Sequence, residues 1–195
     1  MTVKLTVVGR TDVGKVRTNN EDAFVVADLA RSAKLDTSEG EKSVDVPTEG
    51  MLLAVSDGMG GEQAGEVASA LVIESLRREL AANKEMVSGE TITKMLDTAV
   101  FGANKEVFDA AKEPGKKGMG ATLTAVFVMG ETAFIAEVGD SRAYLIRNHR
   151  IRQMTRDQSF VQLLVDAGAI SPDEAKDYPH KNVILQAMGQ KADVK

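Results

Sequence analysis

Residues 55–69 read VSDGMGGEQAGEVAS, and this stretch decides the fold. An apolar run ends there at the carboxylate of Asp57, glycines follow at Gly58, Gly60 and Gly61, and a helical pattern begins at once. Glycine costs backbone entropy on folding, so its density indicates that the turn needs a positive φ or the close approach of another group. Asp-Gly is also a common turn dipeptide. The carboxylate at a strand end nevertheless raises the question of a bound cation.

Short apolar runs of β type surround this turn. AFVVADL at 23–29 and MLLAVS at 51–56 are separated by a polar stretch, which is read as a long connection or an extended hairpin. Later runs are joined by short links, which connect antiparallel neighbours because a parallel return needs a crossover of about a dozen residues or more. These later runs are ATLTAVFVM (121–129), TAFIAEV (132–138), AYLIR (143–147) and IRQMT (151–155).

Two long amphipathic helices are predicted between these groups of strands. Apolar residues recur at three- and four-residue spacing over 62–80 and again over roughly 91–112, so we expect an antiparallel helix pair. A shorter helix is expected in QSFVQLLVDAG, ending at Gly168. In SPDEAKDYP, Ser171 and Glu174 have the spacing of a capping box, which predicts a further short helix.

Composition limits the classes of protein that the chain can represent. It has 195 residues, which predicts one domain, and 24 basic against 29 acidic residues, with a net charge of −5. The charges are interspersed, so a nucleic-acid surface is not expected. No run approaches the ~18 apolar residues of a membrane span, and the N-terminus lacks the organisation of a signal peptide. We therefore expect a cytoplasmic protein without a membrane span.

Residue types also limit the kind of metal site. The chain has no cysteine, which excludes disulfides, thiolate ligands and a cysteine nucleophile. Its histidines are His149, at an expected hairpin tip, and His180. The ligands of any bound metal must therefore be mainly oxygens, which favours Mg²⁺, Mn²⁺ or Ca²⁺.

Two further acidic turns lie at strand ends. RTNNEDAF places Glu21 and Asp22 before an apolar strand, and EVGDSRAY places Asp140 after another. Each turn, taken alone, is compatible with an ordinary solvated turn. Together with Asp57 they form a carboxylate set that suits a two-metal site, in which an acidified bridging water attacks a phosphoryl or acyl centre. In that interpretation Asp57 bridges the metals and Gly58 lends its carbonyl.

The chain also contains five longer stretches in a fixed order: GKVRTNNEDAF, VSDGMGGEQAGEVAS, GMGATLTAVFV, AEVGDSRAYLIRNHRIRQMTRDQSFVQLLVDAGAISPDEA and NVILQAMG. Together they resemble the bacterial branch of the metal-dependent, type 2C-like serine/threonine protein phosphatases, the PPM family. The resemblance implies an α+β fold, a four-layer α-β-β-α sandwich of mainly antiparallel sheets flanked by helical pairs. It also implies a single catalytic domain over 1–195, with a flap at 156–180 beside the active site.

By motif position, the resemblance assigns metal-binding roles. Asp57 would bridge two Mn²⁺ or Mg²⁺ ions, and Gly58 would coordinate through its carbonyl oxygen. Glu21 and Asp22 would hold metal-bound waters. Asp140 would match the acidic residue that bacterial members use for a third, weaker ion.

The resemblance further implies a phosphate contact and a mechanism. Arg17 would grip the substrate phosphate, a role that suits a planar, permanently charged fork. A metal-activated hydroxide would attack phosphoserine or phosphothreonine directly, without a phosphoenzyme. The partners implied are phosphoserine and phosphothreonine proteins, with a cognate serine/threonine kinase and its substrates.

The sequence departs from the family pattern, and two of the departures bear on the chemistry of the site. Met59 stands where many eukaryotic relatives have a histidine proposed as general acid. The Ser-Asp-Gly turn and the Asp-Asn pair that complete the family's dinuclear site do not occur before Lys195. We therefore expect a domain incomplete at its C-terminus, either a fragment or a degenerate member, that is inactive by itself. The alternatives are a non-catalytic module of the same fold, which binds phosphoproteins or a regulatory partner, and a metal-dependent hydrolase for another phosphoester class.

Overall fold

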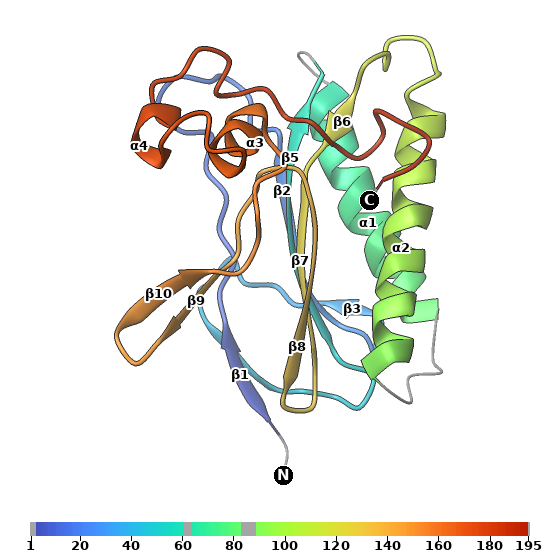
Figure 1. Ribbon diagram of the computed structural model, residues 1–195. Helices are drawn as coiled ribbons and strands as arrows, with labels where there is room; N and C mark the ends of the chain where they lie inside the picture. Colours follow the sequence, from blue (N-terminus) through green and yellow to red (C-terminus); the bar gives the residue numbers. More distant parts are fainter. Residues whose placement is uncertain (1–2, 61–63, 83–88, 195) are drawn as a thin grey trace.

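One antiparallel sheet forms the centre of the molecule. A computed structural model describes residues 3–60, 64–82 and 89–194. Its main sheet has the strand order β3-β2-β5-β7-β8, and a short β6 pairs with the end of β5 (Figure 1). Every pair in this sheet is antiparallel, as the short links predict. The strands are β2 (Asp22–Asp28), β3 (Ala33–Lys34), β5 (Met51–Met59), β6 (Gly120–Ala121), β7 (Leu123–Met129) and β8 (Thr132–Val138).

Two separate ribbons complete the β-structure. Strands β9 (Tyr144–Arg147) and β10 (Arg150–Gln153) form the predicted hairpin, with positive φ at Asn148 and His149 in its tip. Strand β1 (Lys4–Val7) pairs with β4 (Lys42–Asp45), and neither was predicted. Each of these strands is four residues long, and the two pair across a wide sequence separation. No local sequence pattern therefore predicts them.

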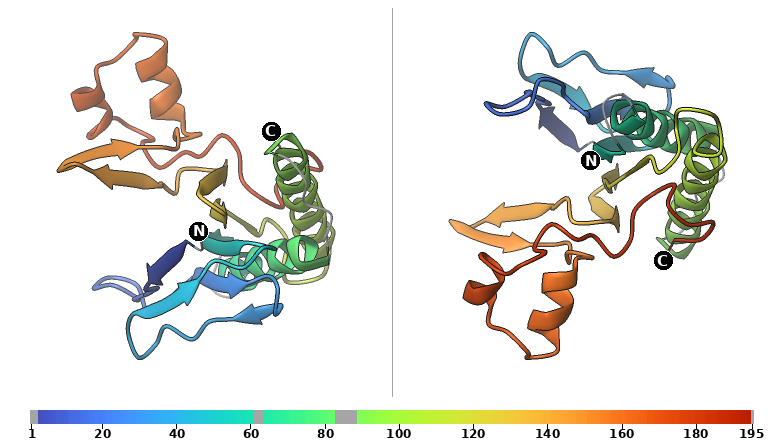
Figure 2. Two further views of the ribbon diagram at one scale, coloured as in Figure 1. Left: turned by 90° about the horizontal axis from the view of Figure 1, so that it is seen from below. Right: turned by 90° about the horizontal axis from the view of Figure 1, so that it is seen from above.

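The predicted helix pair covers one face of the main sheet. Helices α1 (Ala64–Ala82) and α2 (Gly89–Ala110) lie side by side and run in opposite directions, as Figures 1 and 2 show. The predicted start of the first helix at Glu62 lies outside the described residues. No helix among the described residues is long and apolar enough to cross a membrane.

Two short helices follow the β9–β10 hairpin. Helix α3 (Phe160–Asp166) begins at the N-cap Ser159. The predicted stop at Gly168 is confirmed, with a φ of +68°. Helix α4 (Pro172–Ala175) has the predicted capping box, in which the Ser171 and Glu174 side chains bond each other's backbone N–H.

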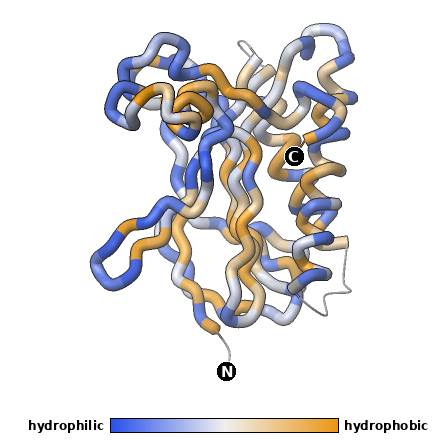
Figure 3. The backbone as a smooth tube through the Cα atoms, in the orientation of Figure 1, coloured by the Kyte–Doolittle hydropathy of each residue, from blue (hydrophilic) through white to orange (hydrophobic). Residues whose placement is uncertain are grey.

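Side-chain alternation divides the main sheet between two cores. Val25 of β2 and Leu52 of β5 face the helices, and this core includes most of the buried apolar residues. Their neighbours Val26 and Met51 face the other way and pack with Val7 of β1. In Figure 3 the apolar stretches gather along these central strands. The expected α+β sandwich is confirmed, with helices on one side of the main sheet and short strand pairs on the other.

Candidate metal centre

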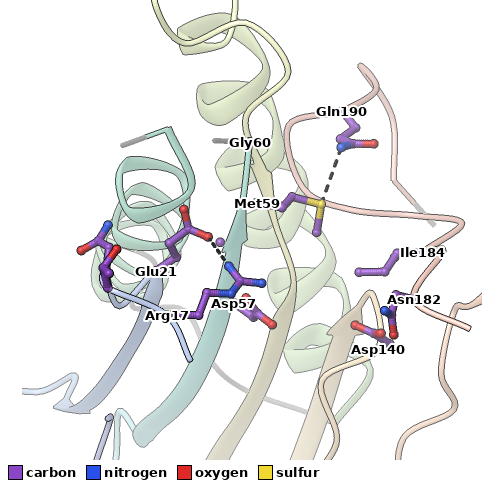
Figure 4. A pocket seen from close by; sticks show the side chains of 12 residues that line it. Arg17, Glu21, Asp57, Met59, Gly60, Asp140, Asn182, Ile184 and Gln190 are labelled. Carbon is purple, nitrogen blue, oxygen red and sulfur yellow. Dashed lines mark hydrogen bonds and ion pairs between the residues drawn. The ribbon is translucent and has the colours of Figure 1, made fainter. Parts of the chain in front are cut away.

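A cavity of about 990 Å³ opens at the end of the sheet where β5 meets α1 (Figure 4). Segments far apart in the sequence contribute to its wall, namely the turn before β2, the end of β5, the turn after β8 and the chain after α4. The lining residues are Arg17, Thr18, Asn19, Glu21, Asp57, Gly58, Met59, Gly60, Asp140, Asn182, Ile184 and Gln190.

Strand β5 continues through the acidic turn instead of ending before it. The expected strand end at Ser56 is wrong, because Asp57, Gly58 and Met59 still pair, Asp57 with β2 and the other two with β6. Gly58 needs no unusual φ, but an ideal Cβ there would lie 2.0 Å from the Gly65 carbonyl oxygen of α1. Gly60 has a φ of +133°, which favours glycine. The close approach of α1 therefore explains the glycine at position 58, and the positive φ explains the glycine at position 60. Gly61 lies outside the described residues.

Glu21 is fixed by the first turns of α1. Its carbonyl accepts hydrogen bonds from the Gly58 N–H at 3.1 Å and from the Ser69 hydroxyl at 2.6 Å. Its carboxylate lies against Gly65, where an ideal Cβ would be 2.8 Å from the carboxyl carbon. The Arg17 guanidinium reaches the same carboxylate at 3.1 Å while its side chain stays 72% exposed. Arg17 is therefore oriented into the cavity and still accessible.

Asp22 lies beside this cavity and not in its wall. It is the first residue of β2 and is paired directly with Asp57. The two carboxylates share a smaller neighbouring cavity of about 220 Å³, which Ser141 also lines. The structure thus brings Arg17 and the predicted metal residues to one end of the sheet, with Asp22 on an adjoining surface.

Asp140 enters the cavity from a tight turn after β8. The turn needs glycine, because Gly139 has a φ of +108°. The Gly139 N–H donates to the Gln158 side-chain oxygen at 2.8 Å, which ties the turn to the start of the flap. Asp140 lies next to Asn182, which projects from the segment after α4 (Figure 4).

The carboxylates concentrate negative charge in partly buried positions. Burial raises the pKa of Asp57, and the charges of Asp22 and Asp140 raise it further. Burial likewise raises the pKa of Asp140, with a contribution from Asp157. A divalent cation would relieve this repulsion, and the oxygen donors suit Mg²⁺ or Mn²⁺. Within the described ranges, however, no three acidic or histidine side chains converge closely enough to enclose a metal ion.

Sequence reasoning did not single out the cavity residues of the C-terminal segment. Asn182, Ile184 and Gln190 lie in the wall because isolated bridges join Ile184 to Ser159 and Met188 to Ala121. The motif NVILQAMG covers Asn182 and Ile184 and ends just before Gln190, but nothing in it indicates which side chains face the cavity. These contacts are non-local and cannot be read from local periodicity.

Comparison with known families gives a match over most of the chain. The sequence profile of the family described as "Protein phosphatase 2C" matches residues 9–162.

Curated relatives match over almost the whole chain. A serine/threonine protein phosphatase, PstP, of Mycobacterium tuberculosis H37Rv is 38% identical over 189 residues, covering 96% of this chain and 32% of the relative. A serine/threonine phosphatase, stp, of Listeria monocytogenes EGD-e is 36% identical, covering 92% of this chain and 65% of the relative. The chain therefore spans less than two thirds of the length of these relatives.

Solved structures have the same fold. Serine/threonine phosphatase Stp1 from Staphylococcus aureus superposes with a TM-score of 0.80 at 33% identity, covering 100% of this chain and 69% of that one. The catalytic domain of PstP in complex with two manganese ions superposes with a TM-score of 0.70 at 34% identity. That alignment covers 97% of this chain and 68% of the other.

Proposed function

The chain belongs to the protein phosphatase 2C family, and we propose that its protein hydrolyses phosphoserine and phosphothreonine in other proteins. The observation that carries the proposal is the convergence of Arg17, Glu21, Asp57 and Asp140 on one open cavity. A phosphate-binding cation and a set of carboxylates in one cavity are the groups that metal-assisted phosphoester hydrolysis needs.

We propose that two Mn²⁺ or Mg²⁺ ions bind here, supported by the two manganese ions of the related PstP structure. Asp57 and the Gly58 carbonyl would hold the ions, Glu21 and Asp22 would hold their waters, and Asp140 would hold a third ion. When bound, such ions acidify water and stabilise the charge that develops on the phosphoryl oxygens. Burial raises the pKa of Asp57, and the charges of Asp22 and Asp140 raise it further. This supports the assignment, because a bound cation would offset the repulsion between the carboxylates.

Arg17 is proposed to bind the substrate phosphate. A guanidinium carries five N–H donors in a planar fork, and one side of this fork is occupied by Glu21. No other side chain in the described ranges pairs with this guanidinium, so its remaining donors can meet phosphate oxygens at the cavity mouth. The ion pair with Glu21 restricts the side chain before substrate arrives, which reduces the entropy lost on binding.

The leaving group is proposed to take its proton from solvent. Met59 lines the cavity where many eukaryotic relatives would have a histidine, and a thioether has no proton to give. The cavity is open, so water reaches the leaving alkoxide.

One observation favours the alternative of a non-catalytic phosphoprotein-binding module. Among the described residues, no three histidine, aspartate or glutamate side chains lie close enough together to hold one metal ion. A site with weak metal affinity would bind a phosphoprotein without hydrolysing it. The cognate kinase, the substrates and a cytoplasmic location stay predictions.

The deciding experiment measures release of phosphate from a phosphothreonine peptide by the full-length protein with Mn²⁺. We expect turnover that is lost with a chelator and reduced at least about a hundredfold in Asp57→Asn, since removing the negative charge of this carboxylate weakens the metal site. Asp45→Asn, on β4 outside the cavity, is the matched control and should keep full activity. Peptide binding without turnover in the wild type would support the binding module instead.

A further inference from the structure

Thr122 lies between β6 and β7, directly across from Asp57, and the strand ladder is altered at this point. In a regular antiparallel pair the two residues exchange two backbone hydrogen bonds. The Thr122 N–H does donate to the Asp57 carbonyl, at 2.9 Å, but the Asp57 N–H donates to the Thr122 hydroxyl, at 2.9 Å. The Thr122 carbonyl accepts instead from the Ser56 hydroxyl, at 2.6 Å. A side-chain oxygen has thus replaced a backbone oxygen.

The same hydroxyl reaches the second acidic turn. Thr122 Oγ1 and Ser141 Oγ are 2.7 Å apart, and Ser141 directly follows Asp140. The Thr122 methyl packs against Gly139 on the other side of Asp140, where an ideal Cβ would lie 2.8 Å from it. Thr122 therefore contacts the backbone of Asp57 and both neighbours of Asp140.

These contacts are rigid. Thr122 is fully buried, and its β-branched side chain has few accessible rotamers. Ser141 is held a second time, because the Thr124 hydroxyl donates to its carbonyl at 2.6 Å. Every fully buried side-chain nitrogen or oxygen in the described part of the chain has a hydrogen-bond partner, so rotation of one hydroxyl would leave another group unpaired at a cost.

We propose that Thr122 and Ser141 are positioning residues that set the separation of the Asp57 and Asp140 carboxylates. Neither hydroxyl lines the large cavity, so both act through the backbone of the acidic turns. The inference rests on the proposed function for its catalytic consequence, since carboxylate spacing decides how well two or three cations are held. Groups that orient metal ligands typically change metal affinity or activity about 10–100-fold when removed.

The test compares three single variants in the full-length protein. Thr122→Val keeps the shape and removes the hydroxyl, Thr122→Ser keeps the hydroxyl, and Ser141→Ala removes only the partner. Thr155→Val is the matched control, because Thr155 is also buried and its hydroxyl accepts from a backbone N–H, that of Ala143. Titration calorimetry gives the Mn²⁺ affinity, steady-state kinetics give kcat and KM for a phosphothreonine peptide, and melting temperatures report stability.

We expect Thr122→Val and Ser141→Ala to weaken Mn²⁺ binding about tenfold and to lower kcat with KM little changed. Thr122→Ser and Thr155→Val should stay within about threefold of the wild type. In the double variant Thr122→Val/Ser141→Ala, the loss of Mn²⁺ affinity should be smaller than the sum of the two single losses. Both substitutions remove the same hydrogen bond between the two hydroxyls. Additive losses, or equal losses in Thr155→Val, would overturn the proposal.

Amide hydrogen exchange on the metal-free protein tests the coupling without any phosphatase activity. Ser141→Ala leaves the acceptor of the Asp57 amide in place, so only a transmitted effect can speed its exchange. We expect faster exchange at Asp57 in this variant and no change in Thr155→Val. Unchanged exchange at Asp57 would refute the coupling, whereas a wild type without Mn²⁺ binding or turnover would refute only the proposed function.

Discussion

Asp57 is partly buried and lies near several other carboxylates. The sequence predicts the neighbouring carboxylates but not the burial. The acidic residues at three strand ends predicted that Glu21, Asp22, Asp57 and Asp140 lie near one another, because antiparallel strands return to the same edge. The register that pairs Asp22 with Asp57 confirms part of this. Local sequence did not reveal that Asp22 faces an adjoining cavity, nor that Thr122 replaces a backbone acceptor, since both depend on contacts between distant segments.

Arg17 allows a prediction at the scale of one residue. Arg17→Ala should raise KM for a phosphothreonine peptide about tenfold and leave Mn²⁺ affinity nearly unchanged, because a charge-assisted phosphate contact contributes to substrate binding. Steady-state kinetics and calorimetric titration measure the two quantities separately. Arg31→Ala, which removes another exposed, ion-paired arginine, should change neither. An unchanged KM in Arg17→Ala would identify Arg17 as a surface residue only.

At the scale of elements, the contact between β5 and α1 determines the shape of the site. The helical periodicity predicted α1, the short apolar run MLLAVS predicted β5, and β8 was predicted with its observed bounds. The split between β6 and β7 was missed, because the apolar run ATLTAVFVM is continuous and the break comes from the Thr122 hydroxyl. Strands β1 and β4 were missed because their pairing is remote in sequence.

Gly58 is expected to be intolerant of any side chain. In Gly58→Ala the new methyl would meet backbone atoms of Gly65 and Glu21, which cannot move without separating β5 from α1. We expect a loss of several degrees in melting temperature, since about 1 kcal/mol corresponds to roughly 2–4 °C in a domain of this size. Gly102→Ala in α2 is the control, because its nearest neighbour is the flexible Glu79 side chain at 3.4 Å and alanine favours helix. Equal melting of both variants would contradict this packing.

A second element-scale prediction concerns the ion pairs between α1 and the sheet edge. Hydrogen bonds from Arg77 and Lys34 hold the pKa of Glu74 at about 2, well below its usual value. A lowered folded-state pKa stabilises the fold above the unfolded value, and this contribution is lost as pH falls from about 4.5 to about 2. Glu74 is partly exposed, so the effect at neutral pH is about 1 kcal/mol or less.

Thermal melting between pH 2 and 7 tests this contribution. Glu74→Gln should melt below the wild type near pH 7, and the difference should vanish near pH 2. Lys34→Met removes one donor and should reproduce part of the loss. A difference that is constant with pH would show that the Glu74 charge is not responsible.

At the scale of the whole molecule, the cavity is assembled from both ends of the chain. Residues near the N-terminus supply Arg17 and Glu21, and the segment after the flap supplies Asn182 and Gln190. The buried Asn104 of α2 holds this last segment by accepting from the Gly189 N–H at 2.8 Å and donating to two carbonyls beyond it. The sequence motifs identified these segments and their order along the chain. Their proximity in space depends on tertiary contacts, which the motifs do not reveal.

The 195-residue chain on its own should respond weakly to metal. In the part of the chain that the structure describes, no three histidine, aspartate or glutamate side chains lie close enough together to hold one metal ion. We therefore expect 1 mM Mn²⁺ to raise the melting temperature by less than about 2 °C, since stabilisation grows with ligand concentration relative to Kd. The measurement is thermal melting with Mn²⁺ and with chelator. A rise of more than about 5 °C would mean that bound Mn²⁺ stabilises the fold by more than about 1 kcal/mol, and it would contradict the expectation.

The direct pairing of Asp22 with Asp57 also limits how this chain can change in length. Side chains alternate between the faces of a strand, so one residue inserted between Met51 and Asp57 would turn the carboxylate to the opposite face or break the pairing. The turn at Gly40, in the connection between β2 and β5, is not constrained in length in this way. A Cβ added at Gly40 would have no atom within 4 Å. Insertions and deletions should therefore be tolerated around Gly40 and rejected within β5, and a library of single-residue insertions selected for folding would show this difference.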